Sequence, residues 1–283
     1  MICGLCKSED MKYLLPMPDN NDIERMIYQC QICHALTAEY DHIPNISLLE
    51  QISLHEDMWS QSKLDEVKHD VEQLEGLVDA LHPFLGKPGP RNKVLEIGCG
   101  RGTLLKALVQ KGYAAHGCEP AKRLVAVARE HLKLGPDVLT HSEFDAFVQL
   151  PQCKAPYKSV IFWHVIEHLD NPMDAFHAAY KLISNSGSII IQLPLLWKNY
   201  IFPEHYFFAT HKTFLFIANS IKCGIENIIY DDENLYVTVI FNKKKIENFK
   251  FLDMQDTPNP IMQLLTVIRK SRNEYKKLYN EMI

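Results

Sequence analysis

Two pairs of closely spaced cysteines near the start of the chain are well suited to bind a metal ion. Cys3 and Cys6 form one pair, and Cys30 and Cys33 form the other, with two residues between the thiols of each pair. Four thiolates in two such turns satisfy tetrahedral Zn²⁺. Redox disulfides are the alternative, but residues 1–40 lack the thioredoxin-like setting that such chemistry needs. We therefore expect a zinc ribbon whose metal supplies the stability that so short a segment lacks.

A glycine-rich turn after a short apolar run has the composition of a nucleotide-binding loop. The sequence VLEIGCGRG, residues 94–102, lets the backbone turn tightly and approach a ligand without an intervening Cβ. The helix that begins near Arg101 directs its N–H groups to the same place, which suits a carboxylate or a pyrophosphate. The loop residues predicted to contact a cofactor are Gly98, Cys99, Gly100 and Gly102.

Two glutamates strengthen the prediction of a nucleotide site. Glu96 lies inside the strand before the first glycine, where a charge is costly without a partner such as a ligand ammonium. Glu119 ends the next predicted strand, where its carboxylate can accept hydrogen bonds from both hydroxyls of a ribose. A surface acid at a strand end is the alternative interpretation of Glu119. Pro120, which follows it, is also expected beside the cofactor.

Residues 162–172 read FWHVIEHLDNP and end another predicted strand at the edge where open α/β sheets bind ligands. Trp163 and His164 are expected to flank the cofactor. His168 is a candidate catalytic residue, and a purely structural role is an equal alternative.

The long aromatic segment 193–211 contains the remaining catalytic candidates. His205 is the first candidate for a general base that takes a proton from a hydroxyl or amine, with Glu204 as its orienting partner. The alternative is a packed aromatic loop in which an interior histidine makes one hydrogen bond.

These candidates lie at the ends of elements in a chain where strands and helices alternate. Strands are predicted at residues 93–97, 114–118, 136–140, 157–163, 188–193, 225–230 and 235–241, and helices at 101–111, 121–132, 173–183 and 211–223. This pattern predicts an α/β fold with a parallel sheet covered by helices on both faces. The last two strands have no helix between them, so we expect an antiparallel hairpin.

Three segments together resemble the class I S-adenosylmethionine-dependent methyltransferases: VLEIGCGRG, GCEP and FWHVIEHLDNP. The resemblance covers about residues 90–242 and is greatest to bacterial enzymes of quinone biosynthesis and sugar methylation. It implies a Rossmann-like seven-stranded sheet with an antiparallel hairpin strand. It also implies that Glu96, Gly98 and Gly100 line the methionine end of the cofactor, while Glu119 holds its ribose. The third glycine comes one residue earlier than in GxGxxG, which favours S-adenosylmethionine over NAD.

Two positions depart from the patterns of these families. Many members place an acid after the third strand to bind the adenine amine, and here Ser142, Glu143 or a backbone group stands there. The segment FPEHYFF is similar to a motif of sugar C-methyltransferases, but Phe202 replaces their tyrosine, so that phenol is missing. An N-terminal zinc ribbon before such a core is again similar to bacterial enzymes that methylate sugars or glycans.

The sequence therefore divides into four predicted regions. They are a zinc-ribbon module at 1–40, a helical linker or lid at 41–92, a methyltransferase domain at 93–242 and a C-terminal amphipathic helical extension at 243–283. Apolar residues recur at helical spacing between Leu64 and Leu81, which supports the helix in the second region.

Composition limits the partners that we expect. The net charge is −5 and the isoelectric point is near 6.2, so nucleic acid is not an expected partner. No apolar run reaches the length of a membrane span, and the start has no signal-peptide pattern, so a cytoplasmic location is expected. The basic C-terminal helix could touch a membrane surface, but a docked helix is favoured. The oligomeric state is not predicted.

The predicted function is S-adenosylmethionine-dependent methyl transfer to a small-molecule or glycan acceptor, at oxygen, nitrogen or carbon. The alternatives are an RNA- or protein-directed methyltransferase and a non-catalytic adaptor built from a zinc ribbon and a Rossmann-like scaffold.

Overall fold

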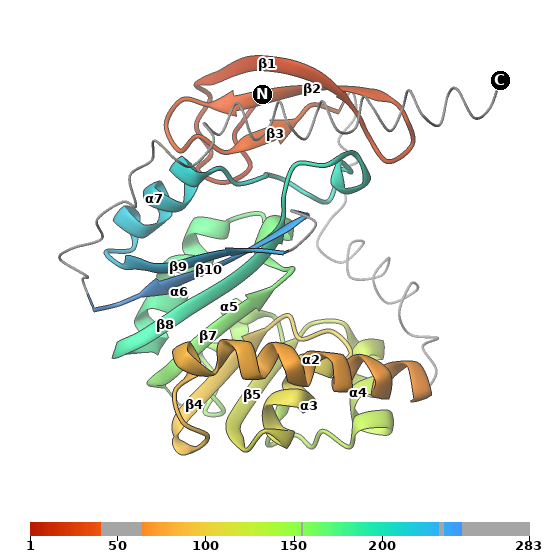
Figure 1. Ribbon diagram of the computed structural model, residues 1–283, viewed down its shortest axis with the longest axis vertical. Helices are drawn as coiled ribbons and strands as arrows, with labels where there is room; N and C mark the ends of the chain where they lie inside the picture. The colour runs from red at the N-terminus through yellow and green to blue at the C-terminus, as the bar shows by residue number, and fades with distance from the viewer. Residues whose placement is uncertain (41–63, 154, 232–234, 245–283) are drawn as a thin grey trace.

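The computed structural model describes residues 1–40, 64–153, 155–231 and 235–244, which form two sheets (Figure 1). The smaller sheet has the strand order β1-β2-β3 and is antiparallel throughout. Its strands are β1 (Met11–Pro18), β2 (Glu24–Cys30) and β3 (Leu36–Ala38). Among the described residues, no helix combines the length and the apolar character needed to cross a membrane.

The larger sheet has seven strands in the order β6-β5-β4-β7-β8-β10-β9. They are β4 (Gly89–Ile97), β5 (Tyr113–Glu119), β6 (Leu139–His141), β7 (Tyr157–Trp163), β8 (Ile183–Pro194), β9 (Gly224–Tyr230) and β10 (Tyr236–Asn242). The first five pair in parallel, and β10 runs antiparallel to both β8 and β9. The seven-stranded α/β sheet with an antiparallel hairpin is thus confirmed.

Helices cover both faces of this sheet. Side chains alternate between the two faces along each strand, so neighbouring residues belong to different cores. Val94, Ile161, Ile190 and Ile240 point to a core shared with α2 (Leu64–Leu85), α3 (Thr103–Gln110) and α4 (Lys122–Leu132). Their neighbours Leu95, Val160, Ile191 and Val239 face the core beneath α5 (Phe144–Phe147), α6 (Pro172–Leu182) and α7 (His211–Ser220). The protein is therefore a three-layer α/β/α structure beside the small sheet.

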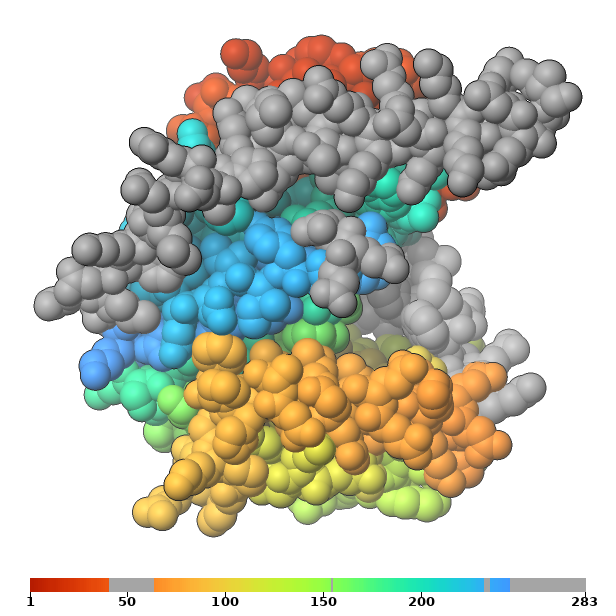
Figure 2. Space-filling model, viewed as in Figure 1, coloured from red at the N-terminus to blue at the C-terminus, as the bar shows by residue number. Residues whose placement is uncertain are grey.

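The helix α2 lies against the larger sheet's helical layer (Figure 2). Its buried residues recur at spacings of three, four and seven, which places them on one stripe against α3 and α4. They are Val67, Val71, Val78, Leu81 and Leu85. The helix predicted in the second region is present in its described part, and the four domain boundaries stay predictions. The predicted C-terminal helix lies outside the described residues.

Three strands differ by more than one residue from their predicted bounds. β8 begins at Ile183 rather than at residue 188, and Ile183 pairs with Tyr157 of β7. β4 begins at Gly89, inside a segment whose prolines and glycines suggest a loop, because Gly89 pairs with Tyr113 across a local shift in register. β6 spans only Leu139–His141, and it begins after a tight turn in which Leu139 donates a backbone hydrogen bond to Gly135.

Candidate active site

The glycine loop joins β4 to α3 at the carboxyl edge of the sheet. Gly98, Gly100 and Gly102 all have positive φ, at 63°, 52° and 75°, which L-residues with a Cβ rarely adopt. A Cβ on Gly98 would lie 2.7 Å from Val165, and one on Gly102 would lie 2.6 Å from Leu134. A Cβ on Gly100 would meet no atom within 4 Å. The loop is therefore packed at its two ends and open at Gly100.

Glu119 fastens this loop to the end of the neighbouring strand β5. Its Oε2 accepts a hydrogen bond from the backbone N–H of Gly100, and its Oε1 accepts one from Ala121, both at 2.8 Å. The residue is 6% exposed, so the alternative interpretation as a surface acid does not hold. A carboxylate has about four lone-pair sites, so two bonds leave room for further donors.

Glu96 lies below the loop on β4 and is buried, with 4% exposure. Its Oε2 is buried and has no hydrogen-bond partner. Burial and the nearby charge of Glu119 raise the pKa of the Glu96 carboxyl well above its ordinary value. A positively charged ligand group beside Glu96 would stabilise the charged form of this buried carboxyl.

The other predicted cofactor residues surround the same edge. Cys99 is buried and its Sγ would lie 3.0 Å from a Cβ on Gly117, so its side chain packs against β5. The backbone N–H of Ser142 donates to the carbonyl of Glu119 at 3.0 Å, which brings the end of β6 beside Glu119. The carbonyl of Pro120 accepts from His141 at 2.9 Å.

Trp163 and His164 end β7 and point to different sides. Trp163 packs against the core that contains α2, α3 and α4. His164 has a φ of 55°, and its ring stands edge-on to Tyr236 with centroids 4.9 Å apart. The turn at His164 therefore directs its imidazole toward the hairpin side of the sheet.

Beyond His164, the chain brings together three side chains from two segments far apart in the sequence. Glu167 and His168 lie on the 3₁₀ turn η1 (Ile166–His168), and His205 lies in the loop after β8. One candidate ligand atom from each lies within 4.8 Å of those of the other two. The rings of His168 and His205 have centroids 4.6 Å apart. We call these three residues the Glu167 cluster.

The acid beside His205 is Glu167, which the sequence analysis did not select. The expected role of Glu204 in orienting His205 stays a prediction. Burial, together with the charges of Asp19 and Glu204, raises the pKa of the Tyr40 phenol. The sequence signal that could have pointed to Glu167 is its position directly before His168. Only the tertiary structure shows that His205 packs against them.

The loop that contains His205 is bound to the small sheet. Leu36 of β3 and Phe208 form a two-way backbone bridge, with both N–H···O distances at 2.8 Å. A Cβ on Gly4 would lie 1.9 Å from the carbonyl oxygen of Tyr206, so only glycine permits this close contact. The Tyr206 N–H in turn donates to the carbonyl of Glu167 at 2.9 Å. The N-terminal module thus holds one side of the Glu167 cluster.

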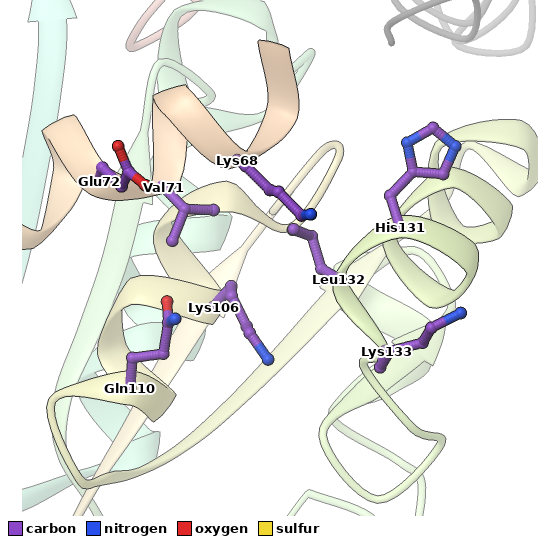
Figure 3. Close-up of a pocket in the computed structure, with 8 residues that line it drawn as sticks. All are labelled: Lys68, Val71, Glu72, Lys106, Gln110, His131, Leu132 and Lys133. Carbon is purple, nitrogen blue, oxygen red and sulfur yellow. The ribbon is translucent and has the colours of Figure 1, made fainter. Parts of the chain in front are cut away.

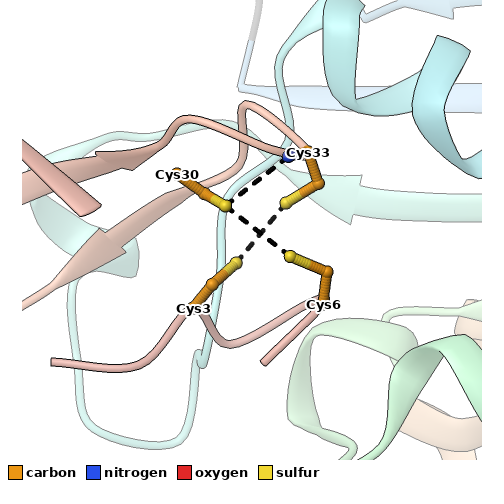
Figure 4. A group of neighbouring side chains, drawn as sticks. All are labelled: Cys3, Cys6, Cys30 and Cys33. Atoms are coloured by element: carbon orange, nitrogen blue, oxygen red, sulfur yellow. Dashed lines mark hydrogen bonds between the residues drawn. The ribbon is translucent and has the colours of Figure 1, made fainter. Parts of the chain in front are cut away.

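The four N-terminal thiols converge in that module (Figure 4). Sγ of Cys3 lies 3.4 Å from Sγ of Cys33, and Sγ of Cys6 lies 3.6 Å from that of Cys30. These distances are far longer than a disulfide of about 2.05 Å. They approach the spacing of about 3.8 Å between thiolates that bind one tetrahedral zinc at about 2.3 Å. The geometry of the four thiols fits a zinc ion.

A separate pocket lies in the helical layer, between α2, α3 and the end of α4 (Figure 3). Its volume is about 310 Å³, and its basic lining residues are Lys68, Lys106, His131 and Lys133. None of the predicted site residues lines it, so it does not compete with the sheet edge as the candidate site.

Comparison with known proteins decides the family. A family model described as a methyltransferase domain matches residues 67–218, which is more than half of the chain. The chain belongs to the methyltransferase domain family. The matched residues run from α2 to α7 and include the glycine loop, Glu119 and the whole Glu167 cluster.

Curated relatives are ubiquinone biosynthesis O-methyltransferases. The protein from Paracidovorax citrulli is 27% identical over 121 residues, covering 42% of this chain and 49% of the relative. The protein from Pseudomonas aeruginosa strain LESB58 is 26% identical over 152 residues, covering 53% and 61%. The chain thus matches about half to three fifths of the length of these relatives.

Solved structures support the fold. Magnesium protoporphyrin IX methyltransferase from Synechocystis PCC 6803, with bound S-adenosylmethionine, aligns with a TM-score of 0.51 at 16% identity, covering 72% of this chain and 99% of that one. An S-adenosylmethionine-dependent methyltransferase from Archaeoglobus fulgidus aligns with a TM-score of 0.50 at 18% identity, covering 68% and 99%. At these identities the similarity establishes the Rossmann-like fold.

Proposed function

We propose that this protein transfers a methyl group from S-adenosylmethionine to an oxygen atom of a small-molecule acceptor. The observation that supports this most is the buried Oε2 of Glu96, which has no hydrogen-bond partner and lies in the strand that leads into a loop open at Gly100. S-adenosylmethionine would supply a methyl group on a positively charged sulfur, and it also brings an ammonium group and a ribose diol.

The residues of the sheet edge suit each part of that molecule. Glu96 would pair with the ammonium group, and the N–H groups at the start of α3 would receive the carboxylate. Glu119 would accept hydrogen bonds from the ribose hydroxyls in addition to those from Gly100 and Ala121. Ser142 would lie on the adenine side, because it follows Glu119 across the β5–β6 pair.

The opposite side, around His205, would bind the acceptor. The acceptor oxygen would attack the methyl carbon, the carbon–sulfur bond would break with its electron pair remaining on sulfur, and the hydroxyl proton would pass to a base. His205 is the first candidate for that base, and His168 lies beside it. Alignment of the two reactants within this confined edge supplies much of the rate enhancement.

The acceptor is expected to present a flat or ring-shaped face. Tyr200 and Tyr236 share a hydrogen bond between their hydroxyls, and the ring of Phe202 packs against that of His205 at a tilt of 36°, with centroids 3.9 Å apart. Aromatic side chains of this kind suit an aromatic ring or the apolar face of a sugar ring. The relatives are named O-methyltransferases of ubiquinone biosynthesis, which favours a hydroxyl as the acceptor group. A sugar or glycan is the more specific acceptor that the sequence suggests.

We also propose that Cys3, Cys6, Cys30 and Cys33 bind one structural zinc ion. The backbone N–H groups of Ile32 and Cys33 point to Sγ of Cys30 at 3.4 and 3.5 Å, which is favourable for a thiolate. The four thiols fill all four positions of a tetrahedral ion, so this zinc would have a structural role.

Calorimetry on the full chain loaded with zinc tests the cofactor assignment. We expect binding of S-adenosylmethionine and of S-adenosylhomocysteine, followed by release of S-adenosylhomocysteine when phenolic or sugar acceptors are supplied. A folded, zinc-loaded protein that binds neither nucleotide would refute the proposal. Binding with no turnover on any acceptor would favour the non-catalytic adaptor instead.

A further inference from the structure

The Glu167 cluster contains a carboxylate that is buried and makes no hydrogen bond in the described structure. Glu167 is 0% exposed, and both of its carboxylate oxygens are buried without a hydrogen-bond partner. Nδ1 of His164 lies 3.7 Å from Oε1 of Glu167, beyond hydrogen-bond distance. A buried carboxylate in this situation is unfavourable unless a cation or proton donor occupies the space beside it.

His205 is held in the orientation and tautomer of a metal ligand. Its Nδ1 lies 2.8 Å from the backbone carbonyl of Tyr200. A carbonyl only accepts, so Nδ1 bears the proton and the neutral ring has its lone pair on Nε2. Histidines that ligate metals commonly donate their second ring N–H to a carbonyl in this way. The ring of Phe202, tilted against the imidazole with centroids 3.9 Å apart, further limits its movement.

The two segments that supply the cluster are joined before any ion binds. The Tyr206 N–H donates to the Glu167 carbonyl at 2.9 Å, so the residues next to His205 are tied to the turn that holds Glu167 and His168. The three candidate ligand atoms lie within 4.8 Å of one another, close enough to surround a single ion after small side-chain rotations.

We propose that Glu167, His168 and His205 bind one divalent transition-metal ion. Two imidazoles and one carboxylate form a ligand set suited to zinc, iron(II), cobalt(II) or manganese(II), and three protein ligands leave coordination positions open. An ion that prefers all-oxygen ligands, such as magnesium, suits the two nitrogen ligands poorly. This site is distinct from the four-thiol cluster, which fills every position of its ion.

The metal ion would also activate the acceptor in the proposed methyl transfer. This role of the ion rests on the proposed function, whereas metal binding itself does not. An acceptor hydroxyl on an open position of the ion would lose its proton at a lower pH, because a metal ion stabilises the oxyanion. His205 would then be a ligand, and the ion would replace it in activating the acceptor oxygen. An acceptor with two neighbouring hydroxyls would fit best, since both oxygens can bind the same ion.

Cobalt(II) uptake by the full chain, with zinc already in the thiol cluster, tests the metal site without cofactor or acceptor. Zinc binds more tightly than cobalt and remains on the thiols. We expect about one cobalt per chain, with the weak visible bands of nitrogen and oxygen ligands. Glu167→Gln and His168→Asn should each weaken uptake by about tenfold or more and leave the zinc content unchanged. Glu130→Gln, at an exposed position on α4 away from the cluster, is the control and should bind cobalt normally.

Several outcomes would overturn the site. They are no cobalt uptake, uptake that Glu167→Gln and His168→Asn leave unchanged, or intense thiolate-to-cobalt absorption that places the ion on cysteines. A cooperative thermal unfolding transition shows that each variant is folded. If Glu167→Gln does not fold, the test uses His168→Asn alone. A protein that methylates its acceptor but takes up no cobalt would refute the metal site alone. One that takes up cobalt but binds no S-adenosylmethionine would refute only the proposed function.

Discussion

At the scale of single residues, the two carboxylates beside the glycine loop differ in their hydrogen bonding. Glu119 receives backbone hydrogen bonds on both oxygens, whereas Oε2 of Glu96 is buried without a partner. Burial and the charge of Glu119 raise the pKa of Glu96 well above its ordinary value. The folded protein therefore holds this proton more tightly than the unfolded chain does. Stability due to this group falls as pH rises from the unfolded pKa toward the folded one.

Glu96→Gln should therefore stabilise the ligand-free protein and weaken its binding of S-adenosylmethionine. At pH 8 we expect the free energy of unfolding to rise by roughly 1 kcal/mol or more, because one pKa unit corresponds to about 1.4 kcal/mol. The gain should shrink as pH falls from the raised pKa of folded Glu96 toward the ordinary carboxyl pKa, because Glu96 of the folded protein takes up its proton over this range. Denaturant unfolding at several pH values measures this, with Glu130→Gln at an exposed site as control. A gain that is equal at every pH would contradict the assignment.

Glu119→Ala should weaken binding of S-adenosylmethionine by about tenfold or more, the scale of a lost charge-assisted hydrogen bond. The substitution also removes the acceptors of the Gly100 and Ala121 N–H groups, so the loop should loosen as well. Isothermal titration measures the affinity, and Glu130→Ala is the control. An unchanged dissociation constant would remove Glu119 from the cofactor site.

The residues of the glycine loop could be selected from the sequence because their signal is local. Gly98, Gly100 and Glu119 sit at fixed places relative to strand ends, and a strand end is visible in the pattern of apolar residues. Glu167 could not be selected as the partner of His205. Their proximity depends on how a loop far along the chain packs back over η1, and no spacing in the sequence records that contact.

At the scale of elements, the proposed acceptor side is formed by two irregular segments rather than by the sheet. The loop after β8 contributes His205, and η1 contributes Glu167 and His168. The parallel sheet with an antiparallel hairpin follows from the alternation of strands and helices, so it was predictable. The early start of β4 at Gly89 was not, because glycine and proline are typical of loops and only pairing with Tyr113 overrides that tendency.

His205→Ala should lower turnover by about a hundredfold or more, the scale of losing an acid–base group or a metal ligand. Affinity for S-adenosylhomocysteine should be unchanged, since the cofactor is expected at Glu96 and Glu119, on other elements. Steady-state kinetics and calorimetry on one preparation separate the two effects. His177→Ala, at an exposed position on α6, should alter neither. Full activity of His205→Ala would remove this residue from the reaction.

At the scale of the whole molecule, the N-terminal module and the methyltransferase domain share structure at the acceptor side. The hydrogen-bonded bridge between Leu36 and Phe208, the contact of Gly4 with Tyr206, and the bond from Thr210 to the carbonyl of His34 all cross between them. Met17, Ile27, Leu196, Ile201 and Phe208 form one apolar cluster across the same boundary. The module therefore supports the loop that contains His205.

Cys30→Ser should release the zinc, lower the unfolding temperature and reduce turnover, while affinity for S-adenosylhomocysteine remains. The reason is that the thiol cluster is remote from Glu96 and Glu119 but joined through β3 to the loop after β8. Hydrogen exchange should show faster amide exchange over residues 196–210 than in the parent protein. Cys153→Ser, which alters a cysteine outside the thiol cluster, provides the comparison. Undisturbed exchange in that loop would show that the module does not support it.

The bridge between Leu36 and Phe208 also has a thermodynamic consequence. If removing zinc loosens the loop that receives the acceptor, then, by reciprocity of binding energies, an acceptor that orders the loop must slow or oppose loss of zinc to a chelator. The rate at which the four cysteines lose zinc would then depend on whether an acceptor is bound at a distant cluster of side chains. A protein saturated with acceptor would surrender its zinc more reluctantly than an empty one.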